Sequence, residues 1–163
     1  MGFKATGRSF EQKTGRRFEV VKVGERFVIL DGAHNPEALE NLVQTWKASP
    51  WSQKKSLWLL GLMKDKDAKA ALKKIAPYVR SLLIVSPPNP RALNAETLAA
   101  LARRLVPHAF VAASQSVEEA VAIWHNGDAK TLVVCGSFYL VAPLRSALSA
   151  LNKKEENSFY EKK

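Results

Sequence analysis

The segment Ile29-Leu30-Asp31-Gly32-Ala33-His34-Asn35-Pro36 is the most informative stretch of this chain. The apolar, β-branched residues that lead to Asp31 predict a buried strand that ends at this acid. After a Gly-Ala turn, Asn35 and Pro36 are typical of the N-cap and the first position of a helix. We therefore expect Asp31 and His34 at the carboxyl end of a strand, beside a helix N-terminus, where α/β sheets bind ligands and phosphate is favoured.

Strand and helix patterns alternate along the rest of the chain. A hairpin is expected over residues 18–31, where apolar and polar residues alternate around Gly24. Pro143 is expected to kink the last helix or to delay its start. The further strands are expected at 56–61, 81–85, 109–112 and 131–135, and the further helices at 67–76, 94–105, 116–126 and 137–151.

This alternation predicts a three-layer, Rossmann-like α/β fold. Its sheet should be mostly parallel, with about six strands and an antiparallel edge hairpin. Right-handed crossovers should then place the strand ends at Asp31, Gly61, Ser86 and Gly136 along one rim. Residues 1–15 are interpreted as a linker or fragment end, 16–151 as one domain, and 152–163 as a polar, disordered tail.

Composition and charge indicate a globular protein rather than a membrane-spanning one. The chain has 163 residues, a net charge of +10 and no apolar run approaching the ~20 residues of a membrane span. One cysteine, Cys135, lies in a predicted buried strand, which fits a small core residue and a reducing cytoplasm. The positive charge favours either an anionic partner or a solvated face with a basic tail. We see no basic face with interleaved aromatics, and expect a cytoplasmic monomer that binds neither nucleic acid nor membranes.

The strand-end residues suggest a ligand site, but each has a plainer interpretation. Asp31 could accept hydrogen bonds from ribose or hold a metal-bound water, and His34 could donate to a phosphate. Alternatively, Asp31 caps the turn and His34 lies at the surface. Asn35 either caps the helix or contacts a base.

Four further groups could bind an anionic substrate. A guanidinium at Arg16 or Arg17 suits bidentate contact with phosphate, and Arg91 follows a rigid proline loop where it could clamp a carboxylate. Lys64 follows a glycine at a strand end, and Ser137 starts a helix with free N–H groups. Surface charges and an N-cap serine are the alternatives. Gly-x-x-x-x-Gly-Lys-[Ser/Thr] is absent from the sequence, so ATP phosphates would need another domain to hold them.

Taken together, the ordered motifs are more specific than their parts. Arg-Phe-Glu, Leu-Asp-Gly-Ala-His-Asn-Pro, Gly-Leu-Met-Lys-Asp-Lys-Asp and Gly-Ser-Phe-Tyr-Leu-Val follow one another at suitable spacing. Over residues 14–151 the chain resembles the C-terminal domain of the folylpolyglutamate synthase/dihydrofolate synthase family, in the Mur ligase superfamily. The resemblance implies an ATP-dependent ligase that forms an acyl phosphate on folate or dihydropteroate, which the amino group of glutamate then attacks.

The resemblance also implies roles for particular residues. Arg17 would reach an ATP phosphate, Asp31 would hold the ribose or orient Arg17, and His34 and Asn35 would line the junction of ATP and glutamate. His34 is the candidate catalytic residue. Ser137, Arg91 and Lys64 would meet the glutamate. The family has its glycine one position nearer the aromatic residue, so Arg16 stays an alternative to Arg17.

The same resemblance implies that the chain is part of a larger enzyme. The N-terminal domain of the family carries the phosphate loop, the Mg²⁺ ligands and the folate site, so we expect no metal ligands in this chain and no activity from it alone. We interpret the chain as an excised domain or a truncated reading frame. A stand-alone nucleotide- or amino-acid-binding module and the C-terminal domain of a peptidoglycan-precursor Mur ligase are the alternatives.

Overall fold

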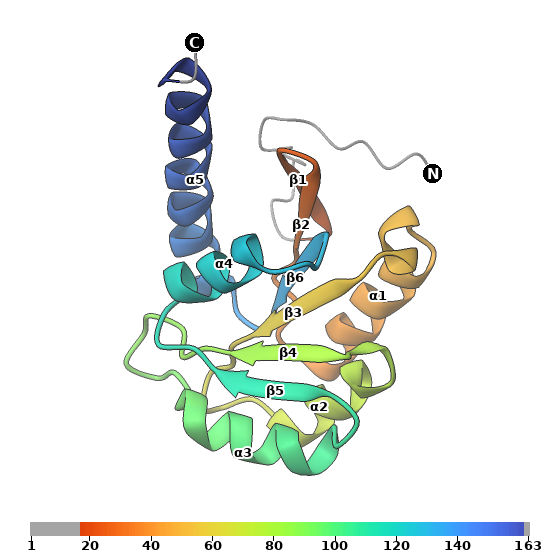
Figure 1. Ribbon diagram of the computed structural model, residues 1–163. Helices are drawn as coiled ribbons and strands as arrows, with labels where there is room; N and C mark the ends of the chain where they lie inside the picture. Colours follow the sequence, from red (N-terminus) through yellow and green to blue (C-terminus); the bar gives the residue numbers. More distant parts are fainter. Residues whose placement is uncertain (1–16, 162–163) are drawn as a thin grey trace.

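A six-stranded, mostly parallel sheet forms the centre of the computed structural model, which describes residues 17–161 (Figure 1). The strand order is β1-β2-β6-β3-β4-β5, and only the β1–β2 pair is antiparallel within the described residues. This confirms the predicted fold class. The strands are β1 (Glu19–Val23), β2 (Arg26–Leu30), β3 (Ser56–Leu60), β4 (Ser81–Ile84), β5 (Phe110–Ala113) and β6 (Thr131–Cys135).

Helices cover both faces of the sheet. Alternate strand residues point to opposite faces, so that Val133 packs with one helix layer and its neighbours Leu132 and Val134 with the other. Helices α1 to α3 form the first layer and α4 and α5 the second (Figure 1). The helices are α1 (Pro36–Lys47), α2 (Ala68–Ile75), α3 (Ala95–Leu105), α4 (Val117–Asn126) and α5 (Val141–Glu161).

The predicted helix starts are confirmed by their caps. The side chains of Asn35, Asp67, Asn94 and Ser116 each accept a hydrogen bond from the backbone N–H three residues on, at 2.8–3.1 Å. Each satisfies a donor that has no partner within the helix. Short polar side chains before apolar, periodic stretches were therefore sufficient to locate these four starts.

The last helix starts later than Ser137, which confirms one of the two expectations for Pro143, but it ends well beyond the expected residue 151. A short 3-10 helix, Phe138–Leu140, precedes α5, and Pro143 lies in the first turn of α5, where its missing N–H costs nothing. The helix then continues to Glu161, so the described part of the tail expected to be disordered is helical. Glu155 makes contact there with His125 of α4, with Nε2 and Oε1 3.0 Å apart.

Loops from four strands meet at one rim, as the crossover rule predicts. The N–H of Gly136 donates to the carbonyl of Ala33 at 2.7 Å, and that of Gly61 to Cys135 at 3.3 Å. Gly136 has φ +105°, and a Cβ added there would lie 2.2 Å from the carbonyl oxygen of Gly61. Only glycine permits this close approach, which brings the loops after β2, β3 and β6 into contact.

Candidate functional site

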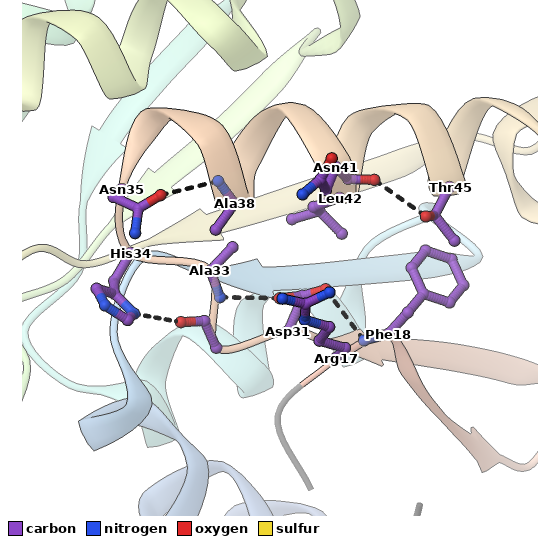
Figure 2. Close-up of a pocket in the computed structure, with 11 residues that line it drawn as sticks. Arg17, Phe18, Asp31, Ala33, His34, Asn35, Ala38, Asn41, Leu42 and Thr45 are labelled. Atoms are coloured by element: carbon purple, nitrogen blue, oxygen red, sulfur yellow. Dashed lines mark hydrogen bonds between the residues drawn. The ribbon is translucent and has the colours of Figure 1, made fainter. Parts of the chain in front are cut away.

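Two adjoining pockets lie at this rim. The first, the Arg17 pocket, has a volume of about 320 Å³ and lies between the start of β1, the loop after β2 and one side of α1 (Figure 2). The second, the Ser137 pocket, has about 190 Å³. The Arg17 pocket is lined by Arg17, Phe18, Asp31, Gly32, Ala33, His34, Asn35, Ala38, Asn41, Leu42 and Thr45, and the Ser137 pocket by His34, Met63, Asp65, Lys66, Arg91, Ser137, Phe138 and Tyr139.

Asp31 forms the floor of the Arg17 pocket and holds the surrounding backbone. Its Oδ2 accepts a hydrogen bond from the N–H of Phe18 at 3.0 Å, and its Oδ1 accepts one from Ala33 at 2.8 Å (Figure 2). Burial raises the pKa of Asp31 above its ordinary value, while these two hydrogen bonds and the charge of Arg17 act to lower it. Both oxygens therefore support the loop, as the plainer interpretation of this acid predicts.

The backbone beside Arg17 has an unusual conformation. Phe18 has φ +42°, which is uncommon for a residue with a side chain and must be held by its surroundings. Its N–H is bound by Asp31, and its ring lies 6.3 Å from that of Trp51. These contacts fix the direction in which the chain carries Arg17. Arg16 lies outside the described residues.

His34 belongs to both pockets. Its Nδ1 lies 2.9 Å from the carbonyl oxygen of Gly32, and a carbonyl only accepts, so this nitrogen carries the proton. In the neutral ring Nε2 is then an acceptor. The side chain is exposed at the boundary of the two pockets, whereas its neighbour Asn35 serves as the cap of α1 through Oδ1.

Arg91 reaches the Ser137 pocket because two loops pair with each other. Met63 and Ala92 form an antiparallel bridge, in which the N–H of Lys64 donates to the carbonyl of Arg91 at 2.8 Å. The side chain of Asn89 also accepts a hydrogen bond from the backbone N–H of Arg91. This pairing leaves no clear signal in the sequence beyond the rigid proline loop.

Lys64 and Ser137 differ from the simplest expectation for a glutamate contact. Lys64 is exposed and does not line either pocket, whereas Asp65 and Lys66, which sequence reasoning did not select, line the Ser137 pocket. Ser137 lines it too, but is buried, and its hydroxyl accepts a hydrogen bond from Tyr139 N–H at 3.1 Å. It therefore acts as an N-cap with its oxygen at the pocket wall.

The other polar residues that could be functional have structural roles or lie outside both pockets. His108 bonds to the carbonyl of Ala76 through Nε2, at 2.8 Å. Cys135 is fully buried, and burial together with nearby Asp31 raises the pKa of its thiol. Among residues 17–161, no group of three or more His, Cys, Asp or Glu could hold a metal ion. Within the same residues, no helix combines the length and the apolar character needed to cross a bilayer.

Comparison with known proteins relates this chain to ligases. Residues 16–138 match the family described as "Mur ligase, glutamate ligase domain". The chain is 34% identical over 137 residues to the dihydrofolate synthase/folylpolyglutamate synthase of Escherichia coli, which covers 82% of this chain and 30% of that protein. It is 30% identical over 111 residues to a UDP-N-acetylmuramoyl-L-alanyl-D-glutamate–2,6-diaminopimelate ligase of Mesorhizobium japonicum, covering 67% and 22%.

Solved structures of folylpolyglutamate synthases have the same fold over most of this chain. The structure of E. coli FolC in complex with DHPP and ADP superposes with a TM-score of 0.66 at 28% identity, covering 79% of this chain and 30% of that one. The chain thus spans less than a third of the length of the relatives it matches. Sequence, fold and rim geometry lead to one conclusion: the chain belongs to the glutamate ligase domain family of the Mur ligases.

Proposed function

We propose that this chain is the C-terminal domain of an ATP-dependent ligase that joins L-glutamate to folate or dihydropteroate. The observation that carries the proposal is the position of His34, which lines both pockets, so that ligands in the two would meet at its ring. The similarity to the E. coli dihydrofolate synthase/folylpolyglutamate synthase supports this choice of substrates.

The Arg17 pocket suits the phosphates and ribose of ATP. A guanidinium binds phosphate oxygens in a bidentate manner, and the exposed side chain of Arg17 lines the pocket. The N-terminus of α1, capped by Asn35, adds partial positive charge at the same place. Because both oxygens of Asp31 are bound to backbone N–H groups, we assign it the task of orienting Arg17.

The Ser137 pocket suits an amino acid with two carboxylates. Lys66 and Arg91 supply two cations, and Asp65, 3.8 Å from the Lys66 ammonium, supplies an anion that can accept hydrogen bonds from a substrate ammonium group. Ser137 adds the dipole of its hydroxyl at the wall. L-Glutamate has this set of charges.

The proposed reaction has two steps. A carboxylate oxygen of folate or dihydropteroate attacks the γ-phosphorus of ATP, which forms an acyl phosphate and releases ADP. The glutamate ammonium loses a proton to solvent, and the resulting amine attacks the acyl carbon. An amide forms as a second proton is lost to solvent, and the C–O bond to phosphate breaks so that inorganic phosphate leaves. His34 Nε2 can accept a hydrogen bond from the amine, and Arg17 stabilises the negative charge on the phosphate oxygens.

We assign the remaining parts of the reaction to a separate N-terminal domain of the same enzyme. ATP chemistry uses Mg²⁺, and the described residues contain no cluster that fits this ion. In line with the family resemblance, we place the metal, the phosphate loop and the folate site in an N-terminal domain of the full-length enzyme. The isolated chain should bind ligands weakly and should not turn them over.

Residue-resolved NMR titration of the chain tests this proposal. ATP should shift the signals of Arg17, Ala33 and His34, and L-glutamate those of Arg91 and Ser137. A parallel assay of ADP release with glutamate and dihydropteroate should give no turnover. ATP shifts confined to other surfaces, or steady ADP release by the chain alone, would contradict the proposal.

A peptidoglycan-precursor ligase is the second candidate, because the M. japonicum relative is 30% identical over 111 residues. The two candidates differ in the amino acid. A titration of the Ser137 pocket with 2,6-diaminopimelate beside L-glutamate separates them. We expect glutamate to bind more tightly by about fivefold or more, and the reverse order would favour the second candidate.

A further inference from the structure

A partly buried ion pair lies next to Arg17 along the chain: the Glu19 carboxylate is buried, and the Arg145 guanidinium is partly exposed. Glu19 on β1 is only 3% exposed, and both of its carboxylate oxygens accept hydrogen bonds from Arg145 on α5. The distances are 3.0 Å from Nη1 to Oε1 and 2.8 Å from Nη2 to Oε2. A bidentate pair of this kind fixes both distance and orientation between the two elements.

This pair is attached directly to the segment that carries Arg17. Glu19 is two residues beyond Arg17, and Phe18, which separates them, has the left-handed φ of +42°. Asp31 binds the N–H of Phe18 from one side of the turn, and Arg145 binds Glu19 from the other. The unusual backbone is thereby held at two adjacent points.

The other end of the contact belongs to a helix whose apolar residues are buried. Arg145 lies in the first turns of α5, between the buried residues Leu144 and Leu148. The helix follows directly on the segment of Ser137, which lines the second pocket. Arg145 therefore links the start of α5 to the start of β1.

We infer that Arg145 is a positioning residue for the Arg17 pocket: through Glu19 it holds the turn at Phe18 and so aims the Arg17 guanidinium at the ligand. The inference deepens the proposed function and rests on it for the identity of the ligand. It assigns Arg145 no contact with substrate. It also explains why an acid stands at Glu19, a buried strand position where an apolar side chain would otherwise be expected.

The fork of the arginine is the essential feature. Lysine would keep the charge but would supply a single ammonium in place of two fixed N–H donors. Arg145→Lys should therefore keep the fold and loosen the turn, while Arg145→Met removes the contact altogether. Because Arg145→Met leaves Glu19 as a buried, unpaired charge, it is accompanied by the double variant Glu19→Gln/Arg145→Met, which removes both charges.

Arg26 offers a matched control on the same hairpin. Its guanidinium also makes two hydrogen bonds to another element, at 2.8 Å to the carbonyl oxygens of Trp124 and Gly127. It lies at the opposite end of β2 from Asp31, and it lines neither pocket. Arg26→Met should therefore affect the hairpin without affecting the Arg17 turn.

The experiment measures two quantities for each variant of the chain: amide hydrogen exchange of Phe18 and the Kd of ATP by NMR titration. In Arg145→Met and the double variant, we expect exchange at Phe18 to accelerate about tenfold or more relative to amides of β3, and ATP to bind about fivefold more weakly. Arg145→Lys should lie between these and the wild type, and Arg26→Met should match the wild type in both.

The outcomes separate the inference from the proposed function. A folded double variant with wild-type exchange at Phe18 and wild-type ATP affinity overturns the inference, even if Arg145→Met does not fold. Equal changes in Arg26→Met would also overturn it, because the effect would then be a general loosening of the hairpin. If ATP fails to bind the wild-type chain at Arg17, the proposed function fails, while the exchange of Phe18 still decides whether Arg145 holds the turn.

Discussion

The Arg17 pocket and the Ser137 pocket share His34 but are built by different means. In the Arg17 pocket, both carboxylate oxygens of the buried Asp31 accept hydrogen bonds from backbone N–H groups. One of these groups belongs to Phe18, whose backbone is left-handed. In the Ser137 pocket, exposed or partly exposed charged side chains project from loops brought together by backbone pairing and by close glycine contacts. The two pockets should therefore respond differently to mutation: backbone support is critical in the Arg17 pocket, and side-chain charge in the Ser137 pocket.

The largest effect should come from the glycine contact that joins the loops. In Gly136→Ala the new Cβ would lie 2.2 Å from the Gly61 carbonyl oxygen, and φ of +105° is unfavourable for alanine. Overpacking and backbone strain together should lower the free energy of unfolding by about 3 kcal/mol. Urea denaturation at neutral pH measures this loss.

Gly24→Ala is the control for that variant. Gly24 also has a positive φ, of +59°, but its added Cβ would meet only the Glu155 carboxylate oxygens, at 3.7 Å or more. We expect a loss of about 1 kcal/mol from strain alone. Equal losses at the two glycines would show that the close packing of the rim loops contributes little.

The next effect concerns Asp31 and its dependence on pH. Asp31→Asn leaves one acceptor for two backbone N–H groups, which should cost about 1 kcal/mol. Because the folded pKa of Asp31 is raised above 3.8, the unfolded chain gives up this proton first, and the stability contributed by Asp31 falls as pH rises from the unfolded to the folded pKa. The wild type's advantage over the variant should therefore be largest below pH 3.8 and smaller at neutral pH.

Urea denaturation of the wild type and Asp31→Asn at a series of pH values measures that difference. Subtracting the two curves removes the titration of other carboxyl groups, as long as they titrate equally in both proteins. A difference that grows as pH rises would mean that the backbone hydrogen bonds and Arg17 outweigh burial and lower the pKa. The loop would then stabilise the charged form.

Features that depend on residues close together in the sequence could be predicted, whereas contacts between distant segments could not. The strand before Asp31, the caps of four helices and the mostly parallel sheet rest on local patterns and general crossover rules, and the structure confirms them. The Glu19–Arg145 pair spans 126 residues, and the loop pairing that delivers Arg91 depends on a bridge between two irregular segments. Such contacts have no local period, so sequence reasoning missed Arg145. Within the Gly61–Asp67 motif it selected Lys64 rather than its neighbours Asp65 and Lys66, which line the pocket.

The shared position of His34 predicts a smaller effect on binding and little on stability. Its ring is exposed and makes one hydrogen bond, to Gly32, so His34→Ala should change the free energy of unfolding by less than about 0.5 kcal/mol. Since the ring lines both pockets, ATP and L-glutamate should each bind about threefold more weakly in NMR titrations. A loss confined to one ligand would place the boundary between the pockets elsewhere.

The smallest effect should be that of Lys64, and it tests whether loop geometry or sequence motif selects the glutamate contacts. Lys64 is engaged through its backbone N–H, which donates to Arg91, while its side chain lines neither pocket. Lys64→Ala should therefore leave the affinity for L-glutamate within twofold of the wild type, whereas Arg91→Ala should lower it about threefold or more. Both side chains are exposed cations, so the loss of one positive charge is common to the two variants and any difference reports position. Repeating the titrations at 0.5 M NaCl screens the long-range electrostatic attraction that both cations exert on glutamate. Equal losses of affinity in Lys64→Ala and Arg91→Ala at this salt concentration would mean that the Lys64 side chain contacts the ligand after all.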